Sequence, residues 1–453
     1  MAIEYPLRYQ AEEKRKAQEE YNRRRKEPYR PSARAQGVSA RTRDAGKQRG
    51  FRKRLKLFSV RAGLDMPFLL LILILLVIGI IMMFSASYPV AYYTTGDSYL
   101  YLKRQLLFAV IGVILMLAIS FFDYHHFHKM AVWILGLGFL LLVVVLFMPS
   151  QNGIHRWIEL GIAGFQASEL MKFALILFFA HWGSVYFYKM DTFKYGVLPA
   201  VVILVPTVVL LLLEPHYSGI VIVTLLTVLM MFISGVKGKW FLFAGVGILL
   251  VFGLMYFTGL LSYAMERMDG WGQALEYTTP EMWQTTWQTR NSMYAIGSGG
   301  LMGLGLGQSR QKYLYLPEPQ NDFVFAIVCE ELGLIGAVII LGIFALLVWR
   351  GITISMKAKD KFGTLLGVGL TSQVGLQVIL NILVITDLLP NTGISLPFFS
   401  SGGTSLLLLL SEMGVLLSIS RAGNAREQRL AEQHRAETER MLQRTRYRSR
   451  AAR

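Results

Sequence analysis

The sequence predicts an all-α polytopic membrane protein with about ten transmembrane helices. Of its 453 residues, 54% are hydrophobic and only 17% are charged, whereas an ordinary soluble domain has about 25% charged residues. Several apolar runs reach about 20 residues, the length that spans a bilayer. The runs are continuous rather than alternating, which argues against a β-barrel. These observations exclude a soluble enzyme, a disordered chain and a fibrous protein.

The first 65 residues form a basic tail, with 19 Lys and Arg against 8 Asp and Glu. Their polar composition predicts a largely disordered segment. Beside a membrane core, such a tail stays in the cytoplasm and can touch anionic lipid, and we do not expect it to bind nucleic acid. The first apolar run starts near Met66, too deep in the chain for a secretory signal peptide. The single cysteine, Cys329, excludes a disulfide scaffold and a four-cysteine metal site.

The membrane domain is predicted over residues 66–421. Its ten apolar segments are 66–87, 104–121, 130–148, 170–187, 195–213, 218–234, 239–259, 324–349, 363–386 and 402–420. The break before the sixth segment, at Glu214-Pro-His216, is tight, and Pro215 and Gly219 disrupt a helix there. A re-entrant turn is one interpretation of this break, because irregular backbone at membrane depth must lie against protein or water.

The distribution of basic residues predicts the orientation. The connections 188–194, 235–239 and 350–361 carry lysines, and the Arg-rich tail at 422–453 adds more positive charge. Cytoplasmic segments are enriched in Lys and Arg. Ten spans then place both termini in the cytoplasm, in a multi-pass protein of the bacterial cytoplasmic membrane.

Three segments face outward in this map, of which 260–323 is the longest. It forms a large extracellular loop between helices seven and eight. Long loops in compact proteins are usually functional or disordered. This one is rich in Trp and Tyr, which favour the membrane interface. We therefore expect it to fold against the membrane surface.

Ionisable residues at the outer ends of the helices are candidates for function, because charge within an apolar span is costly. Glu169 and Lys172 are three residues apart and share a helix face, so they form either a functional pair or a self-satisfying structural one. Asp322 lies where the long loop re-enters the membrane, and it is either a general base or the N-cap of the next helix. Glu318 is a possible second carboxylate. Glu330 and Glu331 follow inside the eighth span, and at least one should face the interior.

A glycine-rich stretch, Gly297–Gly307, contains six glycines in eleven residues. Its backbone N–H groups could cradle a phosphate, with Arg310 and Lys312 close behind, or its glycines could allow close backbone packing. It is not a P-loop, since no Gly-Lys-Ser/Thr follows. A group of one aspartate and three histidines resembles a metal cluster at first sight, but its spacing matches no closed zinc site. Its members are Asp123, His125, His126 and His128.

Four blocks of sequence resemble the SEDS family (shape, elongation, division and sporulation), whose members include FtsW, RodA and SpoVE. The blocks are Arg156-Trp-Ile with Phe165-Gln-Ala-Ser-Glu-Leu-Met-Lys172; Glu214-Pro-His-Tyr-Ser-Gly219; the stretch from Ala295 through Leu316-Pro-Glu and Asp322-Phe to Glu330-Glu-Leu-Gly333; and Leu389-Pro-Asn-Thr-Gly393 with Leu396-Pro-Phe-Phe-Ser-Ser-Gly-Gly-Thr-Ser405. Glu214 and His216 replace the family's usual Gln and Asp. The stretch Gln311–Glu318 is more similar to FtsW or SpoVE than to RodA.

The resemblance implies a peptidoglycan glycosyltransferase that polymerises lipid II at the outer face of the membrane, for cell division, cell shape or sporulation. It implies that Asp322 and Lys172 are catalytic, with Asp322 as base and Lys172 paired with it. The candidate substrate-binding residues are Arg156, Glu169, Gln288, Arg310, Lys312, Glu318, Ser400 and Ser405. No cofactor is certain, and a divalent cation, Mg²⁺ or Mn²⁺, is possible.

The implied partners are a class B penicillin-binding protein, which cross-links the strands, and the proteins of the division or elongation complex. Two other functions fit a polytopic core with buried charge: a lipid II flippase, and a non-catalytic scaffold for a penicillin-binding protein. A flippase should line a path through to the cytoplasm with polar groups, whereas Lys172, Asp322, Arg156 and Arg310 all lie on the outer side. The placement of charge favours the enzyme.

Overall fold

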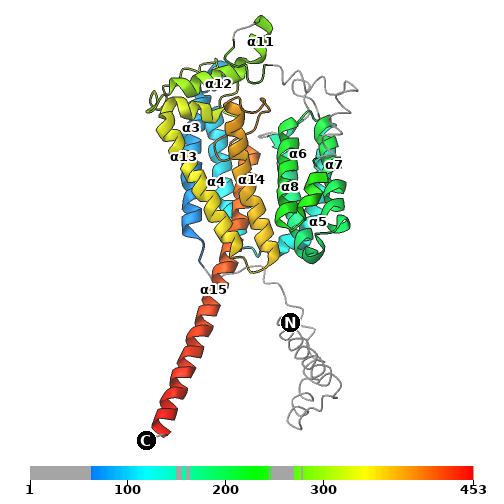
Figure 1. The fold of residues 1–453 in the computed structure, drawn as a ribbon. Helices are drawn as coiled ribbons and strands as arrows, with labels where there is room; N and C mark the ends of the chain where they lie inside the picture. Colours follow the sequence, from blue (N-terminus) through cyan, green and yellow to red (C-terminus); the bar gives the residue numbers. More distant parts are fainter. Residues whose placement is uncertain are drawn as a thin grey trace, which may run out of the picture. The chain divides into compact units, whose positions relative to one another are not determined.

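A computed structural model describes residues 63–148, 156–159, 164–243, 245, 270–276 and 279–451. Within these ranges the regular elements are helices, apart from one small hairpin (Figure 1). The long helices are α3 (Met66–Thr95), α4 (Leu100–Phe121), α5 (His125–Val145), α6 (Ala167–Val185), α7 (Leu198–Leu213), α8 (Tyr217–Ile233), α13 (Val324–Met356), α14 (Lys361–Ile385) and α15 (Gly403–Ala451). The hairpin consists of β1 (Trp157–Glu159) and β2 (Gly164–Gln166), which pair antiparallel. The predicted basic tail lies almost wholly outside the described residues.

The predicted all-helical membrane fold is confirmed. Seven helices of the described chain are long and apolar enough to cross a membrane. They are α3, α4, α5, α7 with the turn before it, α13, α14 and the first part of α15. Helix α8 is apolar but has 17 residues, and α6 has 19 residues that include Glu169 and Lys172. The predicted seventh span, 239–259, lies mostly outside the described residues.

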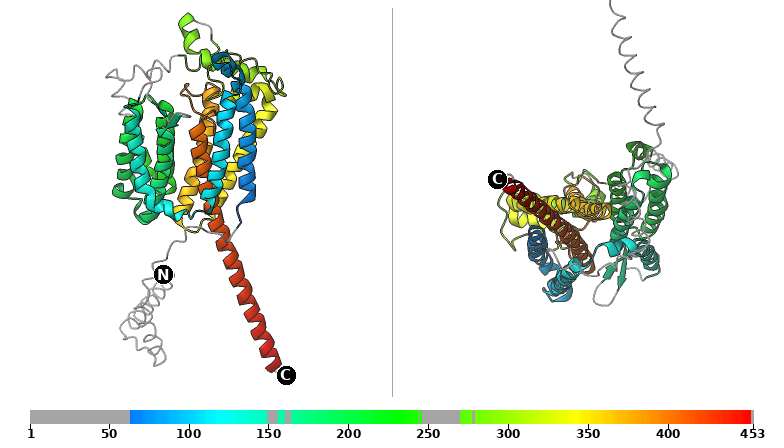
Figure 2. Two further views of the ribbon diagram at one scale, coloured as in Figure 1. Left: turned by 180° about the vertical axis from the view of Figure 1, so that it is seen from behind. Right: turned by 90° about the horizontal axis from the view of Figure 1, so that it is seen from below.

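The helices pack in two groups (Figures 1 and 2). In one group α6 packs on α5 and α8, and α8 packs on α7. In the other, α13 contacts α3 and α14, while α15 contacts α4. Helix α14 joins the groups, because it packs on both α6 and α8. The break predicted at 214–216 is the short connection between α7 and α8.

Helix α13 is interrupted at Gly333, whose φ is 67° and ψ is −172°. The glycine-rich stretch packs against this break. Leu304 N donates to Glu330 O at 2.9 Å, and Leu334 N donates to Gly300 O at 2.9 Å. A Cβ atom on Gly303 would collide with the backbone of Glu331. Close backbone packing, rather than a phosphate cradle, is therefore what these glycines provide, and it satisfies the polar groups that the break exposes.

The described part of the predicted outer loop contains α11 (Pro280–Thr285) and α12 (Trp287–Ser298), which lie at one end of the bundle (Figure 1). Arg290 of α12 is buried and donates to the carbonyls of Ala274 and Glu276, at 2.6 and 3.1 Å. Ser292 Oγ donates to Ile385 O at 2.9 Å. The Arg290 bonds hold the loop together, and the Ser292 bond attaches it to α14. This end of the bundle therefore carries a folded cap.

Helix α15 has 49 residues and continues past the bundle to Ala451 (Figure 1). Its side chains from Leu406 to Arg421 pack in the core, whereas those of 432–439 are exposed. The Arg-rich tail predicted at 422–453 therefore begins as a direct extension of the last membrane helix. It leaves the bundle at the end opposite to α12.

Candidate active site

A cavity of about 230 Å³ opens between the two groups of helices. Its wall includes six of the predicted site residues: Arg156, Glu169, Lys172, Asp322, Ser400 and Ser405. They come from the β hairpin, from the starts of α6 and α15, and from the segments before α13 and α15. The fold thus collects residues that are up to about 250 positions apart in the sequence.

Arg156 enters the cavity from the start of the hairpin. Its guanidinium donates to two backbone carbonyls of the α7–α8 turn, those of Glu214, at 3.4 Å, and Pro215. Thr404 Oγ1 of α15 donates to Gly164 O of β2 at 2.7 Å. The hairpin is therefore attached on both sides, and Arg156 is held over the cavity by the turn that it binds.

Glu169 and Lys172 form an ion pair on the first turns of α6, with Lys172 Nζ 2.8 Å from Glu169 Oε1. Lys172 is 2% exposed. The i,i+3 spacing produces this geometry directly. Lys172 pairs with Glu169 rather than with Asp322, although both line the same cavity. An ammonium at this depth is a strong electrostatic contact for an anionic ligand, since little water screens it.

Asp322 precedes α13 and does not cap it. The helix begins at Val324, Phe323 occupies the cap position, and no side chain bonds to the first turn. The helix-cap interpretation is therefore wrong. The Asp322 carboxylate instead faces the segment before α15, where Oδ2 lies 2.7 Å from the position of a Cβ on Gly393. Burial raises the pKa of Asp322 to about 6, Glu318 adds to the rise, and Arg156 opposes it.

The backbone around Asp322 is held by amides and a hydroxyl. Asn381 of α14 donates to Asp322 O at 2.7 Å and to Ile394 O at 2.6 Å. Ser400 Oγ donates to Asn321 O at 2.7 Å. Asn381 is an uncharged residue near the end of an apolar helix, so sequence reasoning could not single it out. Together these bonds fix the segment that carries the carboxylate against the segment before α15.

Glu214 and His216 lie in the turn before α8. In the sequence they stood out only because they replace the Gln and Asp that are usual in the family motif. His216 is 7% exposed and lines the cavity. Burial lowers the pKa of His216 to about 3, and the nearby cations of Arg156 and Lys172 lower it further, so the ring is neutral. Burial raises the pKa of Glu214 to about 8 against the opposing charge of Arg156.

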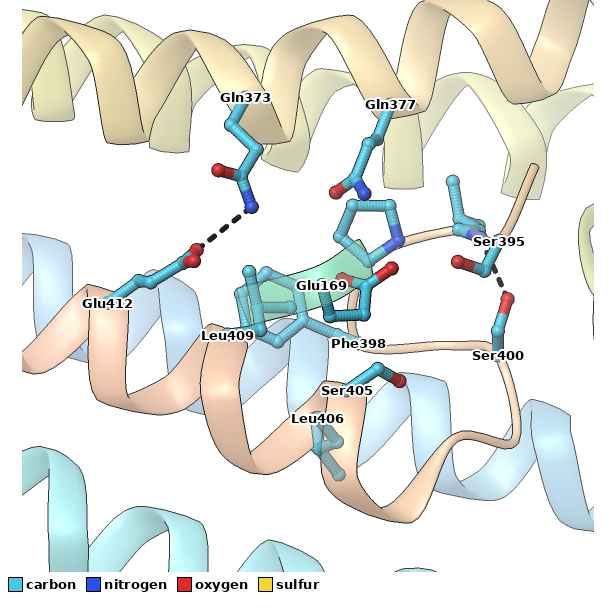
Figure 3. Close-up of a pocket in the computed structure, with 12 residues that line it drawn as sticks. Glu169, Gln373, Gln377, Ser395, Phe398, Ser400, Ser405, Leu406, Leu409 and Glu412 are labelled. Atoms are coloured by element: carbon cyan, nitrogen blue, oxygen red, sulfur yellow. Dashed lines mark hydrogen bonds between the residues drawn. The ribbon is translucent and has the colours of Figure 1, made fainter. Parts of the chain in front are cut away.

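A second, narrower cavity continues from the first between α6, α14 and α15 (Figure 3). Glu169 reaches into it beside Gln377 of α14 and Ser405 of α15 (Figure 3). At its deeper end Gln373 Nε2 donates to Glu412 Oε2 at 3.0 Å. Glu412 and Gln373 are both buried within helices. Sequence reasoning missed them, although a lone acidic residue in an apolar span is a signal for function.

The remaining predicted site residues lie outside the cavity wall. Gln288 accepts from Asn391 Nδ2 at 2.8 Å and donates to Pro317 O at 3.3 Å, so it joins α12 to the segments beside the cavity. Glu318 is exposed and accepts from Gln320 and Asn321. The Arg310 side chain is exposed, away from the cavity residues.

Lys312 also lies apart from the cavity, in a separate buried cluster. Its ammonium is 0% exposed, 2.8 Å from Glu331 Oε1 and 3.1 Å from Ser85 Oγ of α3. Glu330 accepts from the backbone N of Arg310 at 3.0 Å and from the Ser309 hydroxyl. Both glutamates thus face the interior. Lys312 neutralises a buried carboxylate, which leaves it unable to reach a phosphate in the cavity.

The aspartate and histidines at 123–128 lie near the opposite end of the bundle. His125 Nδ1 is 2.6 Å from Asp123 Oδ1, and His128 contacts His181 of α6 at 3.2 Å. In the described part of the chain, no three His, Cys, Asp or Glu residues come together as metal ligands. These histidines pack between helices, away from the cavity.

Comparison with known proteins identifies the family. The model of the FtsW/RodA/SpoVE cell cycle proteins matches residues 66–425. The chain belongs to this family. Stage V sporulation protein E of Bacillus subtilis is 41% identical over 365 residues, which cover 79% of this chain and 97% of the relative. A probable peptidoglycan glycosyltransferase FtsW of Geobacter sp. (strain M18) is 37% identical, with the same coverage.

Solved structures share the fold. A peptidoglycan synthase complex that coordinates polymerization and crosslinking contains a chain with a TM-score of 0.65 and 24% identity, covering 79% of this chain and 98% of its own. The rod shape determining protein RodA of Thermus thermophilus has a TM-score of 0.57 and 25% identity, covering 79% and 97%. The predicted resemblance is confirmed, and the protein is a multi-pass membrane protein with a RodA-like fold.

Proposed function

We propose that this peptidoglycan glycosyltransferase of the SEDS family polymerises lipid II in the cavity between α6, α13 and α15, for division or sporulation. The observation that carries the proposal is the meeting of two cations with one carboxylate that has no ion-pair partner among the described residues. Asp322, Arg156 and Lys172 line the same cavity. A base and charge-binding groups are what a glycosyl transfer from a diphosphate needs.

In the proposed reaction Asp322 accepts the proton of the acceptor sugar's 4-hydroxyl. The hydroxyl oxygen forms a bond to C1 of the donor sugar, and the bond from C1 to the diphosphate oxygen breaks. The polyprenyl diphosphate leaves with the electron pair. Arg156 and Lys172 balance the charge that develops on it, in a partly buried site where such contacts are strong. The reaction as written assigns no step to Mg²⁺ or Mn²⁺, and the carboxylates of this wall are Asp322 and Glu169.

The end of the bundle that carries α12 and the cavity is proposed to face outward, with both termini in the cytoplasm. The lysine-rich connections at the opposite end support this orientation. A crosslinking transpeptidase of the class B penicillin-binding type is proposed as the partner, because the synthase complex with a related chain couples polymerization to crosslinking.

The test is polymerisation of labelled lipid II by the purified protein with its transpeptidase, comparing wild type with Asp322→Asn. We expect long glycan from the wild type and at least about a 100-fold loss in the variant, in line with removal of a general base. Glu318→Gln is the matched control, because this carboxylate lies nearby but outside the cavity, and it should keep most activity.

Other outcomes separate the alternatives. Equal product from wild type and Asp322→Asn would remove this carboxylate from the mechanism. Absence of product from a folded wild-type complex, together with movement of labelled lipid II across vesicle membranes, would support a flippase. Absence of both, with the partner still bound, would support a scaffold.

A further inference from the structure

The cavity wall carries two chemically different sets of side chains. One set is charged and consists of Arg156, Glu169, Lys172 and Asp322. The other set is polar and uncharged, and it comes from the end of β2 and the starts of α6 and α8. Its members are Gln166, Ser168, His216 and Ser218, with His216 beside Arg156 and Lys172. A diphosphate and a reacting hydroxyl account for the charged set, whereas the proposed reaction gives the uncharged set no role.

Two groups of the uncharged set are buried and lack a partner among the described residues. Ser168 is 2% exposed, and its Oγ makes no hydrogen bond. His216 Nδ1 is likewise unpartnered, while Nε2 lies 3.4 Å from Gln166 Nε2. An unmade hydrogen bond on a buried polar group costs about 1–3 kcal/mol. Such groups in the wall of a cavity are explained if a ligand completes their bonds.

The character of these groups identifies the ligand chemistry. The ring of His216 is neutral, because burial and two neighbouring cations disfavour its charged form. A neutral imidazole, a hydroxyl and a carboxamide offer both donors and acceptors and no net charge. Trp157, which is 36% exposed, adds an aromatic surface to the same cavity. Sugar hydroxyl and acetamido groups need this mixture, whereas a phosphate would need cations.

We propose that Gln166, Ser168 and His216 form a subsite for an uncharged sugar ring of the substrate, beside the cations that hold its diphosphate. This subsite rests on the proposed function, since it assigns the sugar and the diphosphate of one substrate to different residues of one cavity. The sugar would accept from or donate to Ser168 Oγ and His216 Nδ1. The subsite would thus orient the ring so that its reacting atom faces Asp322.

Two ligands distinguish the subsite from the rest of the cavity. Lipid II carries the disaccharide, the diphosphate and the polyprenyl chain, whereas a polyprenyl diphosphate without sugar carries only the last two. We expect Ser168→Ala and His216→Ala each to weaken lipid II binding about tenfold, or about 1.4 kcal/mol. Binding of the sugarless diphosphate should change less than about twofold. Lys172→Met should weaken both ligands.

The controls exclude a general effect on folding. Ser234→Ala is the matched variant, because Ser234 Oγ is also buried and unpartnered but lies at the other end of α8, outside the cavity. It should leave both affinities unchanged. His216→Asn, which keeps a polar atom near the Nδ1 position, should recover part of the lipid II affinity that His216→Ala loses.

Equal weakening of the two ligands by Ser168→Ala and His216→Ala, or no weakening of lipid II, would overturn the subsite. Polymerisation by the wild-type preparation is measured in parallel. A wild type that makes glycan while its variants fail to discriminate refutes the subsite alone. A wild type that binds lipid II without making glycan refutes the proposed function.

Discussion

At the scale of single residues, the proposed role of Asp322 as base predicts that activity depends on pH. Burial and Glu318 raise its pKa to about 6, from about 3.9 in an exposed aspartate. A base must be deprotonated to accept a proton. We therefore expect kcat/KM for lipid II to fall about tenfold per pH unit below pH 6 and to level off above it.

Glu318→Gln tests the cause of this shift. It removes the second carboxylate, so the acid limb of the pH profile should move to lower pH while the plateau stays similar. A limb that stays in place in the variant would show that burial alone raises the pKa, since burial is the larger cause. A wild-type limb near pH 4 would show that the titrating group is not Asp322 in this environment.

Residue positions were predictable where the interaction is local. Glu169 and Lys172 share a helix turn, and their spacing alone predicts the ion pair that the structure forms. Lys312 was not predictable, because its partners belong to other elements: Ser85 of α3 is 227 residues away in the sequence and Glu331 of α13 is 19 residues away. A lysine next to a glycine-rich loop suits a phosphate site as well as a buried pair. Only the tertiary fold decides between them.

The Lys312–Glu331 pair predicts a large difference between single and double substitutions. Lys312→Met leaves a buried carboxylate without its cation, which costs about 3–5 kcal/mol of stability. Lys312→Met combined with Glu331→Gln should recover much of that loss. Lys103→Ala, which breaks an exposed pair with Asp97, should cost less than about 1 kcal/mol. Unfolding in detergent measures the wild type, these variants and Glu331→Gln alone. A double variant whose loss equals the sum of the two single losses would contradict the pairing.

At the scale of elements, the interruption of α13 depends on Gly333. Its φ of 67° is unfavourable for other residues, and a Cβ would collide with the backbone of Leu301 and Gly303. Gly333→Ala should therefore destabilise the protein by about 2–4 kcal/mol. Gly342→Ala, in the same helix but with open space around its Cβ, should be neutral. Thermal unfolding of the two variants tests this, and equal midpoints would contradict the role of the break.

Apolar runs did not predict how far some helices extend or where one of them breaks. Helix α3 extends to Thr95, eight residues beyond the predicted apolar run, and the break at Gly333 lies inside one predicted span, 324–349. Hydropathy reports the solvent that a segment prefers. It does not report a backbone break that neighbouring segments repair.

At the scale of the whole molecule, the proposed orientation predicts opposite labelling of two sites. The chain's single cysteine, Cys329, is buried, so added cysteines can be labelled selectively. Leu301→Cys, at an exposed position beside α12, should react with a membrane-impermeant thiol reagent on intact cells lacking an outer membrane. Arg435→Cys, on the exposed part of α15, should react only after lysis. The reverse pattern would overturn the orientation.

The length of α15 has a mechanical consequence. A helix of 49 residues at about 1.5 Å per residue is about 70 Å long. It begins two residues before Ser405, in the wall of the cavity, and continues without a loop to Ala451. A pull or twist applied to its far end would reach the cavity without passing through a flexible joint. The last helix can therefore act as a lever between its far end, on the side proposed to be cytoplasmic, and the cavity proposed for polymerisation.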